Sequence, residues 1–164
     1  MTRDELLAAL RAEHARWEVL LAGIGDDRMH EAGAEDAWSA TEILCHLSGD
    51  QRWLIDQLEM LLGREQGGAA TTPRTSPRTT PFARPHAYDA PFPRQSRRRR
   101  ARGTAYAGGI HVDAAHDFMR LAELVALLPD AQLDECFPWT AGRPLWRVIA
   151  SESYEHYAQH ARSI

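Results

Sequence analysis

The chain has 164 residues, a formal net charge of −4 and 44% apolar residues, with Cys45 and Cys136 as its two cysteines. Such a chain can form one domain over residues 1–164 without a disulfide framework, and the charge indicates no nucleic-acid partner. No apolar run approaches the ~18 residues of a membrane span, and the first residues lack the apolar segment of a signal peptide. We therefore expect a cytoplasmic protein with no membrane contact.

A first helix is predicted from Thr2 to Ile24. Thr2 and Glu5 form a T-x-x-E capping box, and Gly23 and Gly25 end the helix. His14 falls on the apolar face, where we interpret it as a core or boundary histidine with a hydrogen-bond partner. The residues that recur at helical spacing on this face are Leu6, Leu7, Leu10, Trp17, Leu21 and Ile24.

A second helix is predicted to begin at another capping box, formed by Ser39 and Glu42, and to stop at Gly63. Two polar residues, His46 and Asp50, interrupt its apolar stripe. A polar group at such a position costs free energy unless it is satisfied. The apolar residues of the stripe are Ile43, Leu47, Leu54, Leu58 and Leu61.

The helical pattern disappears between the second and third helices. Residues 66–104 hold nine of the 19 basic residues and a single acid, Asp89, together with six prolines. Proline blocks regular helix, and this composition cannot bury an apolar core. The sequence therefore predicts a long, disordered Arg/Pro-rich insert at about 66–110.

The third helix is predicted to begin at Asp113 as its N-cap and to end at Leu128. Its expected inner face consists of Ala115, Phe118, Met119, Ala122 and Val125. Pro144 suits the first position of a last helix that reaches the C-terminus. The expected inner seam of that helix reads Leu145, Ile149, Ser153, His156, His160 and Ile164.

Three histidines on inner faces are the main candidates for chemistry. His156 and His160 lie four residues apart, so a helix places both imidazoles within reach of one ion. His46 is a third polar residue on the inner face of another helix. Asp50, one turn after His46, is a candidate catalytic base, or a carboxylate that orients an imidazole or approaches the metal. The alternative is that these side chains only fill space and hydrogen-bond to their neighbours.

Two stretches resemble signatures of the DinB-like superfamily. The run from Trp38 to Leu47, WSATEILCHL, resembles the W-S-x-x-E/D-x-x-x-H-L signature of its second helix. The run from Ser153 to His160, SYEHYAQH, resembles the T/S-Y-E-H-Y-x-x-H signature of its last helix. The resemblance covers residues 1–63 and 113–164, includes the YfiT-like metalloenzymes, and is strongest to the ClbS/DfsB family.

This resemblance implies an all-α, DinB-like four-helix bundle in which His46, His156 and His160 bind a divalent metal such as zinc or nickel. It also implies a metal-dependent transferase or hydrolase that acts on a small electrophile in detoxification or stress. A low-molecular-weight thiol would serve as cosubstrate, and relatives often form homodimers. Two alternatives stay open: a metal-independent resistance or ligand-binding protein of the ClbS/DfsB type, and a degenerate bundle without catalysis.

Overall fold

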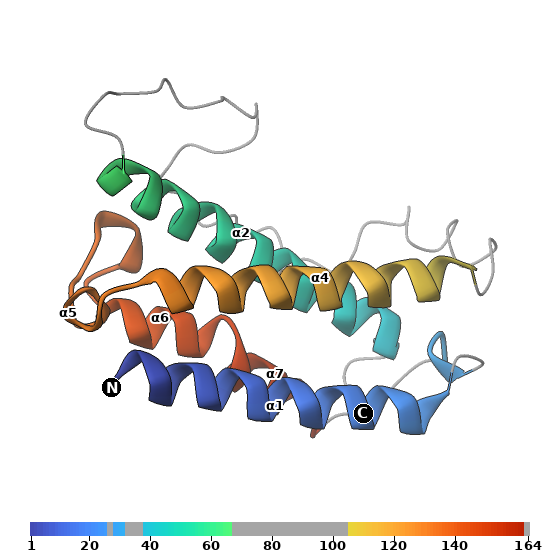
Figure 1. Cartoon of the computed structure of the whole chain (residues 1–164). Helices are drawn as coiled ribbons and strands as arrows, with labels where there is room; N and C mark the ends of the chain where they lie inside the picture. The colour runs from blue at the N-terminus through green and yellow to red at the C-terminus, as the bar shows by residue number, and fades with distance from the viewer. Residues whose placement is uncertain (26–27, 32–37, 67–104, 163–164) are drawn as a thin grey trace.

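The computed structural model describes residues 1–25, 28–31, 38–66 and 105–162, and within these ranges it is helical and contains no strand. The predicted all-α class is confirmed. No helix in the described ranges is long and apolar enough to cross a membrane. The elements in chain order are α1 (Arg3–Ile24), α2 (Ala40–Gln66), α4 (Ala105–Leu127), α5 (Asp130–Leu133), η4 (Pro138–Thr140), α6 (Leu145–Ser151) and α7 (Tyr154–His160) (Figure 1).

Both predicted capping boxes are formed. At the start of α1, the Glu5 amide donates to the Thr2 hydroxyl (3.2 Å), and the Thr2 amide donates to the Glu5 carboxylate (2.8 Å). Before α2, the Ser39 amide donates to the Glu42 carboxylate (2.8 Å), and the Glu42 amide donates to the Ser39 hydroxyl (3.3 Å). Each box satisfies amides that the first helical turn leaves without an internal acceptor.

Replacing Thr2 with alanine is expected to lower the free energy of unfolding by about 1 kcal/mol, because one capping bond is lost. The hydrogen bond from the Thr2 amide lowers the pKa of the Glu5 carboxyl. The bond between the Thr2 amide and the Glu5 carboxylate is therefore present at neutral pH and is lost as the pH falls through the folded-state pKa. Thr2→Ala keeps this amide, so the pH test uses Glu5→Ala. Urea unfolding of the wild type and Glu5→Ala at pH 7 and pH 3 would show a difference at pH 7 that shrinks at pH 3; an equal difference at both values would contradict the role of Glu5.

Two helix boundaries around the predicted insert are wrong. Helix α2 continues past Gly63 to Gln66, since Gly63 keeps an ordinary backbone φ there and does not act as a C-cap. Helix α4 already begins at Ala105, so residues 105–110 belong to this helix and not to the insert. Asp113 is therefore not a cap, and its carboxylate lies 3.9 Å from Arg52 of α2. Residues 67–104 lie outside the described ranges.

The inner face of α4 differs from the prediction at Met119, whose exposed fraction is 56%. Leu121 and Leu124 are buried and face the core. Because two residues advance a helix by about 200°, Met119 points away from a face centred on Leu121. The predicted inner residues Phe118 and Val125 are buried.

The single last helix of the prediction is two helices in the structure. Helix α6 begins after Pro144, which is its N-cap and not its first residue, and the break falls at Glu152 and Ser153. The Ser153 hydroxyl donates to the Ile149 carbonyl, a bond that competes with the regular helical ladder. The last residue of the predicted seam, Ile164, lies outside the described ranges.

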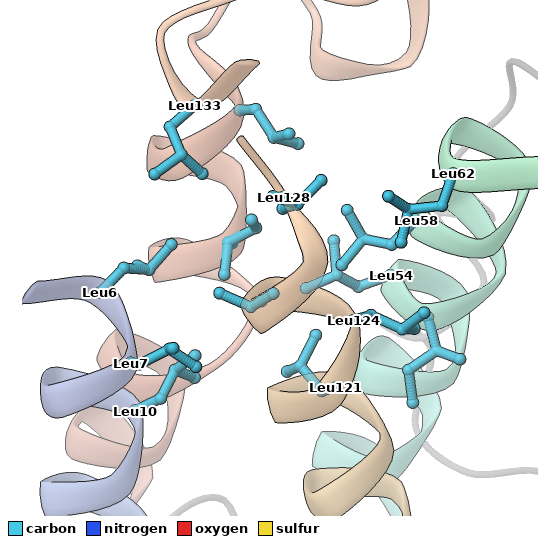
Figure 2. Close-up of a cluster of buried hydrophobic side chains, with 14 of the residues drawn as sticks. Leu6, Leu7, Leu10, Leu54, Leu58, Leu62, Leu121, Leu124, Leu128 and Leu133 are labelled. Atoms are coloured by element: carbon cyan, nitrogen blue, oxygen red, sulfur yellow. The ribbon is translucent and has the colours of Figure 1, made fainter. Parts of the chain in front are cut away.

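The core has two parts. Figure 2 shows leucines from α1, α2 and α4 that converge with others from the C-terminal elements. We call this part the leucine cluster; its members include Leu6, Leu10, Leu54, Leu58, Leu121, Leu128, Leu145 and Ile149. The second part, the Trp17 cluster, consists of Trp17, Leu21, Met29, Ala40, Ile43, Leu44, Leu47, Ala114 and Tyr157.

The Trp17 cluster positions α7. The rings of Trp17 on α1 and Tyr157 on α7 lie 5.4 Å apart between centroids, and both side chains are 2% exposed. Helix α7 also contacts α2, which in turn packs along α4. With Tyr157 held against α1, the histidines on either side of it in sequence face α2.

Candidate metal centre

His46 reaches the interior because the capping box at Ser39 and Glu42 sets where α2 begins. Its imidazole is largely buried, with 12% of the side chain exposed. The ring of Trp38 meets the His46 ring edge-on, with centroids 5.5 Å apart and planes at 87°. This contact restricts how the imidazole can turn.

The structure brings His46, His156 and His160 together, as the sequence predicts. The Nε2 atom of His156 lies 3.2 Å from Nε2 of His46 and 3.1 Å from Nε2 of His160. Each histidine offers one ligand atom, and these three atoms all lie within 4.8 Å of one another. His160 is buried and the other two side chains are largely buried.

Two of the three nitrogen separations fit a shared ion. Two nitrogens bound to one zinc at about 2.05 Å lie about 3.3 Å apart in a tetrahedral site and about 2.9 Å apart at right angles. The observed 3.1 and 3.2 Å lie between these values. The third pair, from His46 and His160, lies within 4.8 Å. Two nitrogens bound to one ion at this bond length are at most about 4.1 Å apart, so a shared ion would draw these two imidazoles closer together.

Hydrogen bonding among the histidines explains the arrangement less well. A neutral imidazole nitrogen carries either one proton or one lone pair, so Nε2 of His156 can form only one good hydrogen bond. It nevertheless has two close nitrogen neighbours. A divalent cation accepts a lone pair from all three nitrogens at once.

Asp50 lies beside two of the three histidines. Its Oδ2 atom is 3.4 Å from Nδ1 of His156 and 3.7 Å from Nε2 of His46, and 13% of its side chain is exposed. It is not among the residues whose ligand atoms converge. A carboxylate at this place favours a proton on Nδ1 of His156, which leaves the Nε2 lone pair for an ion.

Two other polar side chains, Glu152 and His14, have contacts of their own outside the three histidines. Glu152 is buried at the break between α6 and α7, 3.9 Å from the Arg143 guanidinium. The ring of His14 stacks on Phe118 with centroids 3.6 Å apart, and its Nε2 lies 3.5 Å from Glu18. His14 is thus the partnered boundary histidine that the sequence predicts.

Sequence reasoning missed the part that Tyr157 plays. Its burial raises the pKa of the hydroxyl, so the side chain is neutral and acts as an anchor. An aromatic residue between two histidines of a helix was an available signal, because positions 156 and 157 face about 100° apart. One faces α2 and the other faces α1.

The geometry of the three histidines cannot be compared with that of a related protein. A search of family models, of curated proteins and of solved structures finds no match to this chain. The residues of the centre and their contacts therefore carry the functional argument.

Proposed function

We propose that this protein is a metal-dependent transferase or hydrolase with the fold of a DinB-like four-helix bundle, acting on a small electrophile with a low-molecular-weight thiol as cosubstrate. The observation that carries the proposal is the convergence of His46, His156 and His160 from two helices onto one point. The resemblance of residues 38–47 and 153–160 to the DinB-like signatures supports the fold and the reaction class.

The three histidines would hold the ion through one ring nitrogen each. A four-coordinate ion then keeps one position for water or substrate, and a six-coordinate ion keeps three. Zinc and nickel both suit imidazole ligands. The bound metal would supply Lewis acidity towards a thiol, a water molecule or a carbonyl oxygen.

Asp50 has two tasks in this proposal. Its carboxylate orients the imidazole of His156 through Nδ1, 3.4 Å away. The same carboxylate lies 3.7 Å from Nε2 of His46, where it would accept the proton of a thiol or water nucleophile. Partial burial of Asp50 keeps this exchange away from bulk solvent.

The reaction class can be tested with protein purified without a histidine tag, stripped of metal and reloaded with zinc or nickel. Two rates are measured: the displacement of chloride from 1-chloro-2,4-dinitrobenzene by a thiol, and the hydrolysis of 4-nitrophenyl acetate. We expect at least one of them to rise in proportion to the bound metal. The His116→Ala variant, which loses an exposed histidine of α4, is the control and should keep the full rate. Equal rates for loaded and stripped protein in both reactions would contradict the proposal.

Replacing Asp50 with asparagine is expected to weaken metal binding by about 10- to 100-fold, as loss of a carboxylate that orients a metal-binding histidine does. Competition with a chromophoric chelator measures this affinity. Asp56→Asn changes an exposed carboxylate on the same helix and should leave the affinity unchanged. If the two variants bind metal equally well, Asp50 does not orient His156.

A further inference from the structure

The face of α2 that carries His46 continues with an aromatic residue. His46, Asp50, Trp53 and Gln57 follow one another at spacings of four, three and four, so they lie within about 60° of each other around the helix. Side chains of a helix lean towards its N-terminus, so the Trp53 ring covers the surface next to Asp50. His46 of the metal centre and Trp53 therefore lie along the same face of α2.

Trp53 belongs to a group of three half-buried rings. It meets Trp139 edge-on, with centroids 5.8 Å apart and planes at 82°. The ring of Phe137 is nearly parallel to that of Trp139, with centroids 6.0 Å apart and planes at 14°. All three rest on the leucine cluster and keep part of their surface open to solvent.

The segment that carries Phe137 and Trp139 has a bond within its turn and contacts to the end of α6. The Phe137 amide donates to the hydroxyl of Thr140 (3.1 Å), a fully buried residue. The Arg143 guanidinium donates to the Ser151 hydroxyl (3.2 Å) and lies 3.9 Å from Glu152, directly before α7. These contacts tie the segment to the end of α6 and to the break that precedes α7.

We propose that Trp53, Trp139 and Phe137 form a subsite for a flat apolar group of the substrate, most simply an aryl ring, whose polar end reaches the metal. This inference rests on the proposed function, because the polar end of the substrate is the part that binds the metal. Rings that stay half-exposed can stack on a planar ligand and gain burial that they lack in the free protein. From His46 to Gln57 this face carries one carboxylate and no arginine, which favours an uncharged group over an anionic tail.

The test uses two hydroxamates that bind metal through the same group and differ only in their body. We expect zinc-loaded protein to bind 2-naphthohydroxamate about tenfold more tightly than acetohydroxamate, beyond the difference between the two compounds with zinc alone, because ring stacking is added to chelation. Isothermal titration calorimetry gives both affinities. In Trp139→Ala the preference should fall to about twofold or less.

Two further variants keep the result interpretable. Trp53→Leu removes a ring from the same group while keeping an apolar side chain, so it should also lose the preference if Trp139→Ala folds poorly. Trp146→Ala is the matched control: this half-buried tryptophan of α6 lies beside the Arg147 guanidinium, 5.7 Å from its ring centroid, and should keep the preference.

The outcomes separate the subsite from the metal centre. Tighter binding of the aryl compound that both Trp53→Leu and Trp139→Ala abolish supports the subsite. Equal binding of the two hydroxamates, or a preference that survives both substitutions, overturns the subsite and leaves the metal centre standing. If neither hydroxamate binds and zinc itself is not retained, the proposed function and the subsite fail together.

Discussion

Replacing His156 with alanine is expected to weaken the binding of a divalent ion by at least about 100-fold, the upper end of the effect of losing an outer carboxylate. His156 is the shared member of the centre, since its Nε2 atom is close to those of both His46 and His160. Its loss also removes the imidazole that Asp50 contacts. Mass spectrometry of bound metal and chelator competition measure the effect.

The same variant gives a second measurement through stability. At a free zinc concentration 100 times the dissociation constant, binding adds about 2.7 kcal/mol to the stability of the folded protein. For a chain of this size, that is a rise in Tm of about 5 to 10 °C. We expect this rise in the wild type and in the His116→Ala control but not in His156→Ala. A normal rise in His156→Ala would show that zinc binds elsewhere.

Replacing Trp17 with alanine is expected to cost about 3–5 kcal/mol of unfolding free energy. The ring is 2% exposed, and its Nε1 atom forms no hydrogen bond among the described residues, so the cost comes from lost packing and a cavity. Because Trp17 supports Tyr157, the substitution should also loosen α7 and weaken metal binding. Urea unfolding without metal and zinc titration under native conditions measure the two effects separately.

The control for this prediction is Leu121→Ala in the leucine cluster. Leu121 is fully buried, and its truncation should cost about 2–5 kcal/mol. It lies in the other part of the core, so folded Leu121→Ala protein should bind zinc as the wild type does. Equal losses of zinc affinity in the two variants would contradict a specific support of α7 by Trp17.

The starts of α1 and α2 were predictable because their capping signals are local. Thr2 with Glu5, and Ser39 with Glu42, complete their bonds within four residues. The end of α2 and the start of α4 were not predictable in the same way. Gly63 is compatible with both a helix and a stop, and the local sequence does not decide between them. Asp113 is likewise compatible with an N-cap and with the pairing to Arg52 that the structure shows.

The convergence of the histidines was predictable from two facts: polar residues interrupted apolar stripes, and the runs at 38–47 and 153–160 resembled known signatures. Distances were not predictable, because they depend on how α7 lies against α2. The break at Ser153 also escaped prediction, since a serine hydroxyl that bonds to the carbonyl four residues earlier is compatible with a continuous helix. The aromatic contact between Trp53 and Trp139 joins elements far apart in sequence.

The break between α6 and α7 leaves the paired histidines on a helix of only seven residues. Isolated helices shorter than about 12 residues are marginal in water, so α7 depends on its tertiary contacts for its order. Local opening of this segment would separate His156 and His160 from His46 without unfolding the leucine cluster. A bound ion would then hold α7 against α2 and oppose this local opening. Amide hydrogen exchange in α7 would slow on metal binding far more than exchange in α6.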